Sequence, residues 1–223
     1  MGMAFSSEQL DRYSRQIVLK QIGGTGQVRL LQSRVALHGA GPAMRLAALY
    51  LAGAGVGCLG LGHHQPDKPN TSSSGHSLAR ELDQLNPETQ IVKLSHAKGW
   101  DVGSQGPWDA VLCFGMNRAQ VAELQPSPTI LTGLVHQGHG LVVRLGEVCP
   151  GCLETQRLWP VSFGKSPGAE ANMMVGLMGS MAATEVMRGI LGLADTQGPA
   201  GWLINSQTGK GTEVLRCGHG PGR

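Results

Sequence analysis

The chain has 223 residues, of which 34 are glycine and 4% are aromatic, and its formal net charge is +3. This length suits one domain with a sizeable core, and the small charge, without any basic run, argues against a nucleic-acid partner. The sequence contains no apolar run of 18 residues, so we expect no membrane-spanning helix and no membrane partner.

The cysteines and the first residues bear on the cellular compartment. Five cysteines are present, and two of them, Cys149 and Cys152, form a C-x-x-C pair. An odd number with this spacing is typical of a reducing compartment and of a metal or redox site. The opening MGMAFSSEQLDRYSR lacks the apolar core of a signal peptide. We therefore expect a cytoplasmic protein.

In chain order, the first half of the sequence predicts alternating strands and helices. A helix begins near Ser7, which we expect to cap it, with Glu8 in its first turn. The polar segment 63–75 reads as a loop because it contains two prolines and a serine run. The other expected elements are a helix at 26–31, a strand at 34–37, a helix at 44–53, a strand at 58–61, a helix at 77–85 that ends at Asn86-Pro87, and a strand at 90–94.

The second half changes from alternation to strands and one long helix. The expected elements are a strand at 109–114, a helix at 118–124, strands at 129–134 and 141–145, a long helix at 173–191, and a hairpin of strands 202–205 and 212–215 around Thr208-Gly209. This order predicts an α/β fold of Rossmann-like type, with a mixed, mainly parallel sheet flanked by helices. We expect one domain over 1–223, made of N-terminal helices (1–32), a nucleotide-binding-type core (33–145), and a segment with the cysteine pair, the long helix and the hairpin (146–223).

Five ordered motifs give the sequence a family resemblance. They are the opening, with RYSRQIVL at 12–19 and AGAGVGCLGL at 52–61, then Leu85-Asn86-Pro87, the segment from Asp109 to Asn117, the pair Cys149-Pro-Gly-Cys152, and VGLMGSMAATE at 175–185. Together they resemble the ThiF/MoeB/HesA family, bacterial relatives of ubiquitin-activating enzymes. The resemblance implies adenylation of the C-terminal carboxylate of a small ubiquitin-like or sulfur-carrier protein, with ATP and magnesium.

The glycine turn departs from the family pattern GxGGLG. Here Gly39 and Gly41 remain, but Pro42 has no backbone N–H to offer a phosphate, and Met44 replaces the third glycine. Arg45 is a candidate for a compensating positive charge. The alternative is that the turn only joins a strand to a helix.

The next departure lies where family members place Asp-x-Asp for the ribose hydroxyls. This chain has His63, His64 and Gln65, and imidazole cannot act as an anionic bidentate acceptor. His63 is a candidate for a different ligand, although adjacent histidines on a strand point to opposite faces and are poorly placed to share a metal. The alternative is a pair of solvated loop histidines.

The resemblance also implies cations and an acidic magnesium ligand that are replaced here. The loop 69–75 has no cation, and Lys68 lies outside the matching position. Met116 stands in place of the magnesium-binding Asp, and a thioether is too soft for magnesium. Asn117 survives, either as a cofactor contact or as a cap of the following helix. The loop 165–170 has no cysteine in place of the thioester or persulfide cysteine of some members.

Two further sets of residues match the family. Arg15 matches an arginine that family dimers offer across the interface to the partner's ATP, the alternative being a surface salt bridge. Cys149 and Cys152 match a zinc pair, for which the tail supplies Cys217 and His219 as remaining ligands. A reduced thiol pair or a disulfide is the alternative to zinc. Two cysteines in apolar strands, Cys58 and Cys113, read as core.

These departures predict a degenerate family member rather than an ordinary one. We expect a non-catalytic partner, or a subunit that binds a carrier or peptide, in a sulfur-carrier or peptide-modification pathway. It would form a homodimer, or a heterodimer with an intact homologue, through an interface near the small and methionine residues of the helix 173–191. The replaced residues argue against bound ATP and magnesium. The alternatives are an active adenylyltransferase with a rebuilt site, acting on a carrier C-terminus or a small carboxylate, and a pure peptide-binding module.

Overall fold

The computed structural model describes residues 5–39, 41–63, 78–94, 107–122, 129–135, 139–160, 168–194 and 198–218. Within these ranges, the side chains of residues 63, 122, 134 and 168–172 are not described. Among the described helices, none is long and apolar enough to cross a membrane.

From α2 to β3, helices and strands alternate, as the sequence predicts. The helices are α1 (Ser7–Ile17), α2 (Gly23–Gln32), α3 (Pro42–Ala54), α4 (Leu78–Leu85), α5 (Arg118–Ala122), α6 (Pro150–Thr155) and α7 (Gly168–Leu191). The strands are β1 (Arg34–Gly39), β2 (Cys58–His63), β3 (Gln90–Lys93), β4 (Ala110–Phe114), β5 (Thr129–Leu134), β6 (Gly140–Leu145), β7 (Gly201–Ile204) and β8 (Gly211–Val214). The sequence did not predict α6, and α7 begins five residues before the expected start at Met173.

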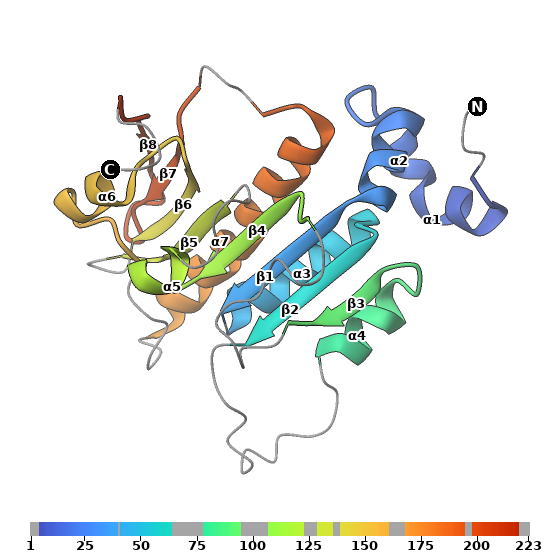
Figure 1. Cartoon of the computed structure of the whole chain (residues 1–223), viewed down its shortest axis with the longest axis horizontal. Helices are drawn as coiled ribbons and strands as arrows, with labels where there is room; N and C mark the ends of the chain where they lie inside the picture. Colours follow the sequence, from blue (N-terminus) through green and yellow to red (C-terminus); the bar gives the residue numbers. More distant parts are fainter. Residues whose placement is uncertain are drawn as a thin grey trace, which may run out of the picture.

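One eight-stranded sheet runs through the molecule in the order β3-β2-β1-β4-β5-β6-β7-β8 (Figure 1). The strands from β3 to β5 are parallel, and β6, β7 and β8 are added in antiparallel fashion. This arrangement confirms the predicted Rossmann-like α/β fold with a mixed, mainly parallel sheet. The expected hairpin around Thr208-Gly209 is the β7–β8 pair.

Both faces of the sheet are covered, which explains the continuous apolar strands. All residues of β4 are buried, as a parallel strand between two covered faces requires. Helices α3, α4 and α7 lie on one face and share a core with alternate residues of the strands (Figure 1). The other face is covered by side chains that include Trp108, Met116 and Leu153. Cys58 and Cys113 belong to this second core, as expected, and burial raises the pKa of both thiols.

The N-terminal helix α1 is fixed to the body by Tyr13. The Tyr13 ring is fully buried, and its hydroxyl accepts a 2.8 Å hydrogen bond from Asn86 and donates one to Glu88. The Asn86 amide also donates to the carbonyl of Ala52 near the end of α3. Two family motifs, RYSRQ and Leu-Asn-Pro, are therefore parts of one buried hydrogen-bonded network.

The cap of α1 is one residue earlier than the sequence predicted. Ser6, rather than Ser7, is the N-cap, and its hydroxyl accepts from the backbone N–H of Gln9 while the Gln9 side chain accepts from the Ser6 N–H. This reciprocal capping box leaves two fewer donors unsatisfied at the helix start, which is why Ser6 prevails over its neighbour.

Small residues of α7 allow this helix to approach α3 closely. Ala182 and Ala183 are fully buried, and a Cβ added to Gly179 would lie 2.5 Å from the carbonyl oxygen of Ala43. The sequence analysis assigned these small residues to an interface between chains. In the structure, Gly179 and the two alanines serve packing within the chain, while Met173 and Leu177 of the same helix remain exposed.

Candidate functional site

The strand register places several predicted site residues at one edge of the sheet. Gly39, the last residue of β1, is aligned with His63 of β2 and with Phe114 of β4. All three are strand ends, so the glycine turn, the end of β2 and the turn after β4 meet at the carboxyl edge of the parallel strands. The chain reverses its order between β1 and β4, which is where ligands bind in open α/β sheets.

The glycine turn adopts a backbone that favours glycine at two positions. Gly39 has a φ of 124°, and a Cβ there would run into the carbonyl oxygen of Phe114. Gly41 has a φ of 99° and is the N-cap of α3. Pro42 occupies the first turn of α3, where its ring suits the helix but contributes no N–H toward an anion. The turn keeps its close backbone approach and has one donor fewer.

Arg45, the predicted replacement charge, has an acidic partner. Its guanidinium forms an ion pair with Glu81 of α4, and both side chains are partly exposed. This pairing offsets the positive charge at the start of α3 and directs it toward α4. A role for Arg45 toward phosphate stays a prediction, and it requires the ion pair with Glu81 to open.

The turn after β4 is closed by apolar and capping contacts. Met116 is 1% exposed and belongs to the second core, and the indole N–H of Trp159 donates a 3.0 Å hydrogen bond to its carbonyl. Asn117 caps α5: its side-chain oxygen accepts from the N–H of Gln120, and the Gln120 side chain accepts from the Asn117 N–H. Asn117 thus fills the capping role that the sequence analysis gave as one of two alternatives.

Arg15 lies exposed in the last turn of α1 and forms no hydrogen bond or ion pair with any residue that the structure describes. It therefore lacks, within that part of the chain, the surface salt bridge that was the alternative to a role in a dimer. The His63 side chain, His64, Lys68 and the loop 69–75 lie outside the described parts, as does the segment 161–167.

Three cysteines come together beyond the ends of β6 and β8, in the antiparallel part of the sheet. The Sγ atoms of Cys149, Cys152 and Cys217 all lie within 4.8 Å of one another. The N–H of Cys149 donates to Cys217 Sγ at 3.1 Å, and the N–H of Cys152 donates to Cys149 Sγ at 3.4 Å. Cys149 is the N-cap of α6, so this short helix presents the pair. His219, the fourth predicted ligand, lies outside the described residues.

The thiols of this cluster influence one another. The hydrogen bond with Cys149 raises the pKa of Cys152 to about 11, and burial and the neighbouring Cys217 act in the same direction. None of the three forms a disulfide. Three sulfur atoms that converge in this way suit a soft or borderline cation such as zinc.

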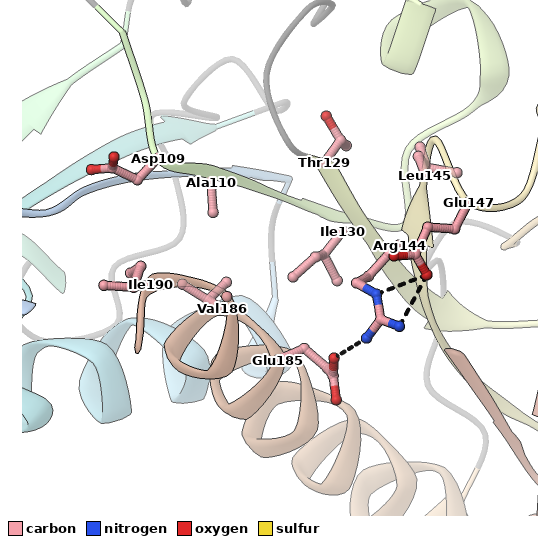
Figure 2. A pocket seen from close by; sticks show the side chains of 11 residues that line it. Asp109, Ala110, Thr129, Ile130, Arg144, Leu145, Glu147, Glu185, Val186 and Ile190 are labelled. Carbon is pink, nitrogen blue, oxygen red and sulfur yellow. Dashed lines mark hydrogen bonds and ion pairs between the residues drawn. The ribbon is translucent and has the colours of Figure 1, made fainter. Parts of the chain in front are cut away.

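Two adjoining pockets lie at the amino ends of the strands, away from the glycine turn. One has a volume of about 170 Å³ and is lined by residues that include Asp109, Ile130, Arg144 and Glu185 (Figure 2). The other, of about 350 Å³, shares Asp109 and is lined partly by α2. The sequence analysis did not predict these pockets, because they depend on where the strand starts meet α2 and α7.

Ion pairs between Arg144 and two glutamates form one wall of the first pocket. Arg144 lies between Glu185 of α7, at 2.6 Å, and Glu147, at 3.0 Å (Figure 2). In the sequence, Glu185 is recognisable only as the last residue of the VGLMGSMAATE motif. Its partner Arg144 is 41 residues away in the chain, so the pairing had no local signal.

Curated relatives and solved structures agree on what this chain resembles, although no family model matches it. The sulfur carrier protein ThiS adenylyltransferase of Escherichia coli K12 is 30% identical over 221 residues, which cover 86% of this chain and 84% of that protein. The adenylyltransferase and sulfurtransferase UBA4 of Eremothecium gossypii is 36% identical over 129 residues, which cover 49% of this chain and only 28% of that protein.

Structures give the same fold at lower sequence identity. The crystal structure of PaaA superposes with a TM-score of 0.69 at 17% identity, covering 96% of this chain and 85% of that one. The structure of Escherichia coli MccB with ATP gives a TM-score of 0.65 at 17% identity and covers 95% and 72%. The motifs, the sheet order and the 30% identity to the ThiS adenylyltransferase over most of both chains lead to one conclusion: the chain belongs to the ThiF/MoeB/HesA family of adenylyltransferases.

Proposed function

We propose that this protein is a degenerate family member that acts as a non-catalytic partner or as a carrier- or peptide-binding subunit in a sulfur-carrier or peptide-modification pathway. The similar proteins support the pathway class, because one of them is the adenylyltransferase of the sulfur carrier ThiS and MccB has been solved with the peptide MccA. The chain keeps the scaffold and has lost the residues that the chemistry needs.

The burial of Met116 is the observation that carries this proposal. Adenylation with magnesium needs an oxygen ligand at the end of β4, and the family resemblance places that ligand at this position. The Met116 thioether lies in an apolar core instead. The pairing of Arg45 with Glu81 and the missing N–H of Pro42 weaken the phosphate side of the same edge. Removing one group that stabilises transition-state charge costs about 3 kcal/mol, and several are altered here.

Calorimetry with ATP and magnesium tests the loss of nucleotide binding. We expect weak binding of ATP, with no strengthening when magnesium is added. An active adenylyltransferase with a rebuilt site would instead bind ATP at micromolar concentration and require magnesium, and that result would overturn the proposal.

The partner role is proposed from Arg15, which is exposed and lacks a partner within the described part of the chain. In a dimer, the Arg15 guanidinium would be available to neutralise the phosphate charge of ATP bound in the partner's site. Co-purification with a catalytically complete homologue, followed by comparison of the adenylation rate with wild type and Arg15→Ala, tests this. The rate should fall with Arg15→Ala. If no homologue binds but a carrier or peptide does, the chain is a peptide-binding module instead.

We also propose one structural zinc ion held by Cys149, Cys152 and Cys217, with His219 as the fourth ligand. The edge of a tetrahedral zinc–thiolate site is about 3.8 Å long for Zn–S bonds of about 2.3 Å. Sulfur atoms within 4.8 Å of one another need to move by only about 1 Å to reach this geometry. The metal would lie three inter-strand steps of about 4.8 Å each from β1, so its role is structural rather than catalytic.

A further inference from the structure

Five charged side chains form a continuous chain of ion pairs from α7 to the tail. In order they are Arg188, Glu185, Arg144, Glu147 and Arg216, and they are called the arginine–glutamate chain below. The pairs measure 3.0 Å, 2.6 Å, 3.0 Å and 3.1 Å from the α7 end to the tail end. Figure 2 shows its central part, where Arg144 lies between the two glutamates.

Burial makes the ion pair between Arg144 and Glu185, at the centre of the arginine–glutamate chain, stronger than an ion pair on the surface. The side chains of Arg144 and Glu185 are 17% and 8% exposed, and Arg144 also donates to the carbonyl of Pro199 at 2.6 Å. Ion pairs removed from water are screened less by solvent and salt. The Arg144 side chain is therefore held in place by Glu185 and the Pro199 carbonyl, and its ion pair with Glu147 attaches the turn at Glu147 to it.

At its tail end, the arginine–glutamate chain contacts the cysteine cluster. The carboxylate of Glu147 pairs with Arg216, and the backbone carbonyl of the same Glu147 accepts the N–H of Cys217 at 3.1 Å. Arg216 also donates to the carbonyl of Gly198. Cys217 Sγ in turn accepts from the N–H of Cys149. Glu147 thus contacts both Arg216 and Cys217. Glu147 itself precedes Cys149 by two positions in the sequence.

We propose that Glu147 and Arg216 are positioning residues of the cysteine cluster. They keep Cys217 next to Cys149 through contacts that do not involve a metal. The ion pairs of Arg144 with Glu147 and Glu185 connect these contacts to α7. The consequence for metal affinity rests on the proposed zinc site, because a preformed set of ligands reduces the ordering that binding requires. The contacts of Glu147 and Arg216 that position Cys217 are expected in the metal-free protein as well.

The matched control is an ion pair between α5 and α6, the short helix that Cys149 caps. Arg118 pairs with Glu154 of α6 at 2.8 Å, and both side chains are about half exposed. Arg118→Met and Arg216→Met therefore remove the same kind of charge near the cluster. Arg216→Lys keeps the charge on the tail, and Glu147→Gln keeps the backbone carbonyl while removing both of its ion pairs.

The first measurement uses the full-length protein with a chelator present, so that it does not depend on zinc. Alkylation of Cys217 by iodoacetamide is followed by peptide mass spectrometry, with a thermal melt to verify folding. We expect Cys217 to react about fivefold faster in Arg216→Met and Glu147→Gln, near the wild-type rate in Arg118→Met, and at an intermediate rate in Arg216→Lys. Equal rates in wild type and Arg216→Met would overturn the proposal.

The second measurement uses metal ions as the probe. Titration with cobalt, whose thiolate absorption bands report cysteine ligation, followed by competition with zinc gives the affinity of each variant. We expect Arg216→Met to bind about tenfold more weakly than wild type, and Arg118→Met to match wild type. If wild type shows no thiolate bands, the proposed zinc site is wrong, and the alkylation rates alone decide whether Glu147 and Arg216 position Cys217.

Discussion

Met116 is the residue on which the proposed loss of adenylation depends. It follows the turn that ends β4, and its side chain packs among apolar residues. The replacement at this position is therefore more than the absence of a carboxylate, because the Met116 side chain belongs to an apolar core. Restoring the family residue alone would place an acidic group in an apolar environment.

We predict that Met116→Asp destabilises the protein without creating a magnesium site. An unpaired carboxylate in this core should lower the free energy of unfolding by about 3 kcal/mol or more. Met116→Leu, which conserves volume, should change it by less than about 1.5 kcal/mol. Urea unfolding measures both. Unchanged stability of Met116→Asp together with magnesium-dependent ATP binding would show that the site is intact around this position.

Tyr13 gives a prediction for alkaline pH. Burial raises the pKa of Tyr13 above its ordinary value of 10.0, and the nearby Glu88 carboxylate adds to this. The folded protein then holds the hydroxyl proton more tightly than the unfolded chain does. The resulting stabilisation is complete below pH 10 and is lost as the pH rises through the folded pKa.

The comparison with Tyr13→Phe isolates this effect. At pH 8 the variant should be less stable by about 1 kcal/mol, because the Asn86 amide loses one acceptor. The free energy of unfolding of wild type should then fall more steeply above pH 10 than that of Tyr13→Phe, so the two converge. Parallel curves from pH 8 to pH 11 would contradict the assignment.

At the scale of elements, the contact between α3 and α7 sets how the start of α3 is held behind the sheet. We predict that Gly179→Ala costs about 1–3 kcal/mol of stability, because its Cβ would lie 2.5 Å from the Ala43 carbonyl. Gly176→Ala is the control on the same helix, since its nearest neighbour is Leu46 at 3.9 Å. That variant should be neutral or more stable by up to about 1 kcal/mol. Thermal melts distinguish the two, and equal effects would show that the helices separate easily.

Local pattern predicted most elements and failed where distant residues decide. The strands β1 and β4 and the β7–β8 hairpin follow from apolar runs and turn residues. Helix α6 was missed because Pro150 and Gly151 are poor helix formers, and the cap that starts it is the Cys149 sulfur. The site shows the same limit. The sequence placed Cys217 in the cysteine cluster, but the ion pairs of Arg45 and Arg144 join residues 36 and 41 positions apart.

At the scale of the whole molecule, the cysteine cluster is expected to attach the tail to the body. We predict one zinc per chain by elemental analysis of protein purified without chelators. Removing the metal should lower the melting temperature and expose the tail to proteases, with little change in the affinity for any ligand at the glycine turn. Well below half an equivalent of zinc would show that the cysteines have lost this role.

We propose that a family scaffold persists here without its own adenylation chemistry. Magnesium-dependent exchange of pyrophosphate into ATP, measured on the purified protein with candidate carrier and peptide C-termini, tests it most directly. We expect no exchange above background with any of them, while an intact family member assayed in parallel exchanges readily. Exchange by this chain alone that depends on magnesium and on a C-terminal carboxylate would contradict it.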